Sequence, residues 1–141
     1  MKTPVFFPPM SDFPTTELKP SETTWPKLLS QIHNPPKKLY CRGNLALLNS
    51  SCFAVVGTRK LTSYGKDTSQ HIVRDLVNAG FTIVSGLALG IDAVAHQTTL
   101  DCGGRTIAVL GGGVGNGSIG PQANYQLAQD IYGIGFFSAD K

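Results

Sequence analysis

The chain has 141 residues, of which 41% are hydrophobic and 15% charged, so it can bury one compact core but not two full domains. Its net charge of +3 is too small for a polycation that binds any anion, and it contains no run of about 18 apolar residues that could span a membrane. Its three widely spaced cysteines include no CxxC pair, which argues against a disulfide framework or a zinc site and predicts a cytoplasmic protein.

The charges are unevenly distributed along the chain. Residues 24–66 contain seven Lys or Arg residues and no Asp or Glu, whereas residues 67–141 contain six acids and three bases. This asymmetry predicts a localised positive face, which favours an anionic partner.

Composition divides the chain into three regions. Residues 1–23 contain five of the nine prolines, which predicts a flexible, extended leader. Residues 24–50 predict a small N-terminal appendage, beginning with a short helix because apolar residues recur at helical spacing after Thr24. Residues 51–141 predict the main domain.

Apolar runs separated by turn residues predict alternating strands and helices. Predicted strands cover 38–42, 52–56, 81–84, 106–110 and 135–138, and predicted helices cover 64–79, 91–101 and 124–131. The run at 52–56 has no polar alternation, as expected of a parallel strand that is covered on both faces. The order of the elements predicts an α/β fold with a Rossmann-like, mostly parallel sheet and helices on both faces.

Three glycine-containing loops follow the predicted strands, at 57–65, 85–92 and 111–121. Ligands of open parallel sheets collect at the carboxyl ends of the strands, where glycine lets backbone amides approach a phosphate. We therefore predict a phosphate-binding site there. Its predicted residues are Gly57, Thr58, Arg59, Lys60, Ser63, Tyr64, Gly65, Ser85, Gly86, Ala88, Gly90, Asp92, Gly111, Gly112 and Gly113.

Individual side chains in these loops allow more than one reading. Arg59 could form two hydrogen bonds to a phosphate, and Tyr64 could either stack on a base or fill the core. Asp92 could simply offset the dipole of the helix that it begins. His96 lies four residues further on, but no third ligand has suitable spacing, so we predict neither a metal nor a cofactor. Ser85 has no evident base, and we predict no catalytic residue.

Several sequence blocks occur between Trp25 and Ser138 in a characteristic order. They are Asn34-Pro35-Pro36, Leu39-Tyr40-Cys41-Arg42-Gly43, Val55-Val56-Gly57-Thr58-Arg59, Ile83-Val84-Ser85-Gly86-Leu87-Ala88, Gly90-Ile91-Asp92-Ala93-Val94-Ala95-His96 and Gly103-Gly104-Arg105-Thr106-Ile107-Ala108-Val109-Leu110-Gly111. In this order the chain resembles the DNA-processing protein A family, also called DprA or Smf.

The resemblance implies a non-enzymatic protein of natural transformation that binds single-stranded DNA and acts with the RecA recombinase. Its basic pocket would hold DNA phosphates with little base specificity. Arg59 would be the main phosphate contact, with backbone help from Gly57, Thr58, Ser85 and Gly86. Partners implied are single-stranded DNA, RecA and a second copy of the chain.

The chain departs from the family pattern in two places. The loop at 113–121 lacks the family's Asp and Tyr, although Pro121 and Asn124 remain. Family members also continue for about another half of the Rossmann-like domain, so we expect a sheet that is incomplete at the C-terminus. The chain would then be a fragment, or a minimal version that closes its sheet edge by pairing with another chain.

Two other functions stay open from the sequence. A nucleotide-binding or nucleotide-hydrolysing enzyme could use the same glycine turns for a free nucleotide. An inactive gene fragment is the second alternative.

Overall fold

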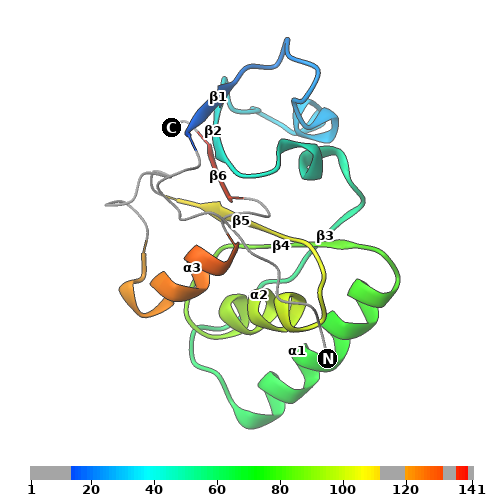
Figure 1. Cartoon of the computed structure of the whole chain (residues 1–141), viewed down its shortest axis with the longest axis vertical. Helices are drawn as coiled ribbons and strands as arrows, with labels where there is room; N and C mark the ends of the chain where they lie inside the picture. The colour runs from blue at the N-terminus through cyan, green and yellow to red at the C-terminus, as the bar shows by residue number, and fades with distance from the viewer. Residues whose placement is uncertain (1–13, 112–119, 132–135, 140–141) are drawn as a thin grey trace.

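The computed structural model describes residues 14–111, 120–131 and 136–139, and for the last range only the backbone (Figure 1). The described strands are β1 (Thr16–Leu18), β2 (Leu39–Arg42), β3 (Cys52–Ala54), β4 (Thr82–Ser85), β5 (Thr106–Leu110) and β6 (Phe136–Ala139). The described α-helices are α1 (Ser63–Asn78), α2 (Ile91–Asp101) and α3 (Tyr125–Ile131). Short 3-10 helices are η2 (Lys27–Gln31), η3 (Leu45–Asn49) and η5 (Gln122–Asn124).

The six strands form one sheet in the order β1-β2-β6-β5-β4-β3. Strands β3, β4, β5 and β6 are parallel neighbours, and α1, α2 and α3 connect them in turn. Strands β1 and β2 extend the sheet in antiparallel pairing beyond β6. The predicted α/β fold with a mostly parallel sheet is therefore confirmed. The last described strand, β6, lies inside the sheet, and the edges are β1 and β3.

All three α-helices cover the same face of the sheet (Figure 1). Val73 of α1 and Ala95 of α2 are fully buried against Ile83 of β4. Next to them, Ala128 and Ile131 of α3 pack with Ala108 of β5. Because side chains alternate between the faces of a strand, Ile107 points to the opposite face. The sequence predicts helices on both faces of the sheet. In the structure, the described α-helices lie on one face and 3-10 helices pack on the other.

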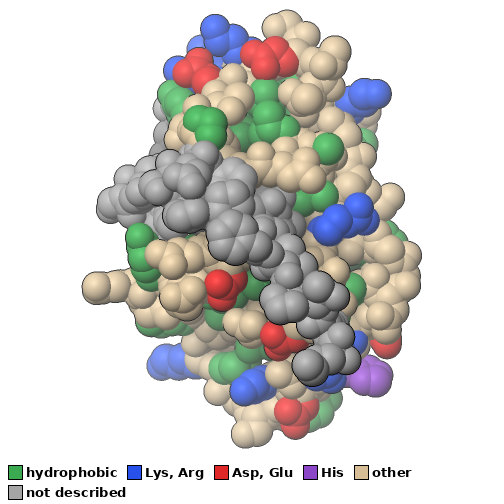
Figure 2. All heavy atoms as spheres, viewed as in Figure 1, with side chains coloured by type: hydrophobic (Ala, Val, Ile, Leu, Met, Phe, Trp, Pro, Cys, Tyr) green, Lys and Arg blue, Asp and Glu red, His purple; other side chains and the backbone are tan. Residues whose placement is uncertain are grey.

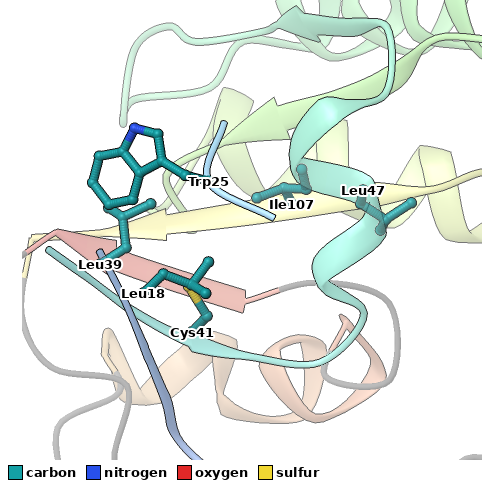
Figure 3. Close-up of a cluster of buried hydrophobic side chains, with 6 residues drawn as sticks. All are labelled: Leu18, Trp25, Leu39, Cys41, Leu47 and Ile107. Atoms are coloured by element: carbon teal, nitrogen blue, oxygen red, sulfur yellow. The ribbon is translucent and has the colours of Figure 1, made fainter. Parts of the chain in front are cut away.

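The second face holds a separate apolar cluster, drawn in Figure 3. Its buried members are Leu18, Trp25, Leu39, Cys41, Leu47 and Ile107. These residues come from β1, β2, β5, η3 and the segment before η2, so the N-terminal part shares its core with the main sheet. Asn49 joins the segments further, since its amide nitrogen donates to the Trp25 carbonyl at 3.2 Å and its oxygen accepts from the Lys27 amide at 3.1 Å.

These observations correct the predicted leader and appendage. Thr16–Leu18 is a strand paired with β2, and Leu18 is only 1% exposed, so the predicted flexible leader is wrong at these residues. The short helix expected after Thr24 is instead the 3-10 segment η2, which ends at Gln31 because Ile32 already has an extended backbone. Residues 1–13, which make up most of the predicted leader, lie outside the described residues.

Strand β3 also differs from its prediction. We expected 52–56 to be buried on both faces, yet β3 is an edge strand and all three of its residues are exposed. A short apolar run fits a covered strand and an open edge equally well, because only the neighbours in the sheet distinguish them. Phe53 is 47% exposed and touches the ring of Phe81 edge-on, with the centroids 5.6 Å apart.

Candidate nucleic-acid interface

The loop before α1 and the loop before α2 are in direct contact. The Ile91 amide donates to the Thr58 carbonyl oxygen at 3.1 Å. Gly90 has φ = 85°, and a Cβ atom there would collide with this carbonyl and lie 2.8 Å from the Arg59 Cα. A Cβ on Gly57 would lie 2.8 Å from the Ile91 side chain. The two loops approach this closely only because both positions are glycine, and two of the three predicted loops therefore meet.

Asn124, at the end of η5 and just after the third predicted loop, contacts the second loop. Its side-chain nitrogen donates to the carbonyl oxygens of Leu87 at 2.9 Å and Ala88 at 3.2 Å. Asn124 was noted in the sequence only as a family residue and was not among the predicted site residues. Gly111 is exposed, and the predicted residues Gly112 and Gly113 lie outside the described residues.

Asp92 is used to shape the second loop. Its Oδ2 atom accepts hydrogen bonds from the amides of Gly86 at 3.2 Å and Ala88 at 3.3 Å, and the side chain is 7% exposed. Asp92 lies in the first turn of α2, but its carboxylate bonds to amides of the preceding loop and not to those of its own helix. A carboxylate at this place repels a phosphate and occupies the amides that a phosphate would need.

Ser85 is likewise engaged inside the protein. Its hydroxyl donates to the Val55 carbonyl at 2.7 Å, and the residue is 3% exposed. The prediction that Ser85, Gly86 and Ala88 offer donors to a phosphate is therefore corrected, because the described structure uses these donors to join β4 and its loop to neighbouring segments.

Several donors of the first loop have no acceptor within the described structure. Arg59 and Lys60 are exposed, and neither forms an ion pair with a described residue. The amides of Thr58 and Arg59 donate to no acceptor in the described ranges. The Thr58 hydroxyl accepts from the Lys60 amide at 3.1 Å, which holds the loop in a tight turn.

The N-terminus of α1 adds to this group. The Thr62 hydroxyl accepts from the Gly65 amide at 3.0 Å and caps the helix, whose first turn contains no acid. The Ser63 and Tyr64 amides donate to no described acceptor. A helix N-terminus with free amides carries partial positive charge and favours an anion. Lys66, also exposed, lies in the same turn.

Tyr64 is 79% exposed, so its alternative role as a core residue is wrong. Other exposed apolar side chains belong to the same two loops and the end of β3. They are Val56, Leu61 and Leu89, at 72%, 37% and 45% exposure. An aromatic ring among cations offers a surface on which a nucleobase can stack.

His96, in α2, is fully buried. Its Nδ1 atom is 2.7 Å from the Thr106 hydroxyl, which in turn donates to the Ile83 carbonyl at 2.9 Å. Burial lowers the pKa of His96 to about 4, so the ring is neutral at neutral pH. Within the described ranges, no group of three His, Cys, Asp or Glu side chains could hold a metal ion.

Figure 2 shows how charge is distributed over one face of the molecule. Lys and Arg side chains lie there in small groups separated by acidic and uncharged atoms. The candidate anion site is formed by donors of the first loop and of the N-terminus of α1. The described helices include none long and apolar enough to cross a membrane.

Comparison with known proteins decides the family. The sequence model of DNA recombination-mediator protein A matches residues 17–138. The chain belongs to this family. Among curated members, the chain is 39% identical over 112 residues to DNA processing protein DprA of Bacillus subtilis, covering 79% of this chain and 37% of that protein. It is 42% identical over 127 residues to Protein Smf of Synechocystis sp., covering 87% of this chain and 31% of that protein.

Solved DprA structures share the fold. DprA from Streptococcus pneumoniae matches with a TM-score of 0.79 and 37% identity, over 92% of this chain and 44% of that one. DprA from Helicobacter pylori, whose structure was described for its single-stranded DNA binding mode, matches with a TM-score of 0.73 and 32% identity, over 91% of this chain and 56% of that one. The Rossmann-like fold predicted from the sequence is thereby confirmed. The chain spans less than half the length of the curated relatives named here.

Proposed function

We propose that this chain binds single-stranded DNA through its phosphates, in DNA uptake and RecA-mediated recombination. The observation that carries the proposal is the group of unused donors on the first loop and on the N-terminus of α1. Arg59 and Lys60 are exposed without ion pairs to described residues, and the amides of Thr58, Arg59, Ser63 and Tyr64 have no described acceptor. Membership of the DprA family and the single-stranded DNA binding described for the H. pylori protein support the same function.

The proposed contacts predict binding with little sequence preference. The donors suit phosphate oxygens, and a ring such as that of Tyr64 stacks on any base. For single strands, log K falls with log salt by about 0.7 per phosphate neutralised. Three phosphate contacts would give a slope of about −2.

Replacing Arg59 by Ala tests the proposal. We expect weaker binding to every oligonucleotide sequence, and a salt slope less steep by about 0.7, because one phosphate contact is lost. Fluorescence anisotropy with a labelled oligothymidine at several salt concentrations measures both quantities. Arg74→Ala is the matched control, since it removes an exposed arginine from the body of α1. Equal binding by the wild type and Arg59→Ala would remove Arg59 from the proposed site.

We further propose that the protein acts by binding and not by catalysis. The Ser85 hydroxyl donates to the Val55 carbonyl, and the neutral ring of His96 is fully buried. Both groups are thus kept from a ligand at the surface. Incubation with nucleoside monophosphates, followed by chromatography for released base, tests this proposal. Base release by the wild type but not by Arg59→Ala would favour the nucleotide-hydrolysing alternative.

A second copy of the chain and RecA are the proposed protein partners. Support for self-association comes from β3, where the Ser51 carbonyl and the Val55 amide bond to β4 at 2.8 and 2.9 Å. Alternate residues of a parallel strand bond to the same neighbour, so the backbone groups of Cys52 and Ala54 face away from the sheet. Light scattering tests the dimer. Co-sedimentation of the protein with RecA on single-stranded DNA tests the RecA contact.

A further inference from the structure

Asn124 and Asp92 both hold the second loop in place by hydrogen bonds to its backbone. The backbone of residues 86–88 is held at its amides by the Asp92 carboxylate, and at its carbonyls by the Asn124 side chain. Leu87, between these contacts, adopts the left-handed φ of 65° and is completely buried. Asn124 itself is 8% exposed and lies 36 residues or more from the residues that it contacts.

Residues 86–88 are followed by residues that contact the backbone of the proposed DNA-binding loop. Two residues beyond Ala88, Gly90 touches the backbone of Thr58 and Arg59, and the Ile91 amide donates to the Thr58 carbonyl. A shift of residues 86–88 therefore moves the surface against which the Arg59 backbone rests. The two backbones are packed without room for a Cβ atom, so a movement of one displaces the other.

We propose that Asn124 is a positioning residue for Arg59, acting through residues 86–91. This inference rests on the proposed function, because it assigns Asn124 to the same DNA site. The first loop would then be positioned by the second loop, and the second loop by Asn124 of η5. The sequence pattern around Asn124 did not indicate this role.

The chemistry of the side chain fits the role closely. A carboxamide nitrogen has two N–H groups and can bond to two adjacent carbonyl oxygens at once. Leucine has a similar size but leaves both carbonyls without a donor, and aspartate places negative charge against them. Serine can reach one carbonyl at most. We therefore expect Asn124→Leu and Asn124→Asp to loosen the second loop and weaken DNA binding more than Asn124→Ser.

A purely structural role makes a different prediction. If Asn124 only stabilised the fold, replacing it would change loop mobility and DNA affinity no more than replacing any other buried side chain that lowers stability by the same amount. Val73→Ala provides this comparison, because Val73 is buried in α1, packs with Ile83 and Ala95, and belongs to neither loop. All variants are compared under conditions in which each is more than about 95% folded by circular dichroism.

The experiment combines two local measurements with DNA binding. Trypsin cleavage after Arg59 and Lys60 and hydrogen exchange of the Gly86 and Ala88 amides report the loops, and anisotropy reports DNA affinity. For Asn124→Leu we expect cleavage, exchange and the dissociation constant each to rise about tenfold, with a smaller rise for Asn124→Ser. Val73→Ala is expected to stay within about twofold of the wild type in all three.

The outcomes separate this inference from the proposed function. Cleavage and exchange that match Val73→Ala would overturn the positioning role, whatever the DNA result. Loosened loops with unchanged DNA affinity, in a protein whose binding needs Arg59, would also overturn it and leave the proposed function standing. A wild type that binds no DNA would reject the proposed function, and with it the assignment of Asn124 to a DNA site. Should Asn124→Leu fail to fold, Asn124→Ser decides by the same three measurements.

Discussion

At the scale of single residues, His96 makes the stability of the fold depend on pH. Burial lowers the pKa of the folded ring to about 4, compared with 6.5 for an ordinary histidine. Between these pH values the unfolded chain binds more protons than the folded chain, so the free energy of unfolding rises with pH. The stabilisation is complete above about pH 6.5 and is lost as the pH falls toward 4.

Urea denaturation at pH 7.5, 6 and 5 measures this dependence. We expect the wild type to lose about 1 to 2 kcal/mol between pH 6.5 and 5 through His96 alone. His96→Gln should lack this part of the loss, whereas His71→Gln should keep it, because His71 is an exposed residue of α1. Equal pH dependence in the wild type and His96→Gln would show that the buried ring does not titrate as proposed.

Gly90 tests the contact between the first two loops. Both Gly90 and Gly80 have positive φ, at 85° and 93°, but a Cβ at Gly80 meets nothing within 4 Å. Gly80→Ala should therefore cost only the strain of the left-handed backbone, about 1 to 2 kcal/mol. Gly90→Ala should cost more and should also weaken DNA binding, because the Arg59 backbone must move. Urea denaturation and anisotropy compare the two variants, and equal effects would argue against close packing of the loops.

Single residues also show what a sequence can reveal about the site. Gly57 and Gly90 were predicted because a glycine after an apolar run is a local signal. The hydrogen-bond partners of Asp92 and Asn124 could not be predicted, because both side chains bond to the backbone of a loop whose path the sequence does not specify. The same residue types can donate to a ligand or to the protein itself. Only the fold shows that the Ser85 hydroxyl donates to Val55, whereas the Thr58 amide has no described acceptor.

At the scale of elements, local patterns predicted some boundaries well. The helix at 91–101 and the strand at 106–110 begin and end where predicted, because caps and glycines mark them. Strand β1 was missed, since three residues in a proline-rich region form a strand only through their pairing with β2. The edge position of β3 was missed for the same reason, because it depends on the strand order.

Strand β3 is an edge of the sheet formed by the described strands, and this predicts self-association that one added charge should weaken. Residues 51–58 contain no charged residue and no proline, although edge strands commonly carry such protection. Ala54→Lys should lower the apparent dimer fraction at high concentration, measured by light scattering. Leu28→Lys, on the exposed surface of η2, is the control with the same gain of charge. A wild type that is monomeric at every concentration would contradict the proposed partner surface.

At the scale of the whole molecule, the sheet joins the predicted appendage and the main domain in one fold. Antiparallel β1 and β2 continue the parallel strands, and apolar residues from both regions share the cluster around Trp25. The fold class could be predicted from the alternation of strands and helices. The way in which the N-terminal strands join the sheet could not, because long-range antiparallel pairing leaves no local pattern.

The proposed DNA site consists of donors of the first loop and of the N-terminus of α1 that have no acceptor among the described residues. Titration of the ¹⁵N-labelled protein with oligothymidine, followed by NMR, tests it most directly. We predict that the amide signals of Thr58, Arg59, Ser63 and Tyr64 shift most, and that those of Gly86 and Ala88, held by Asp92, shift little. Shifts concentrated on Gly86 and Ala88, or on a surface away from both loops, would contradict the account.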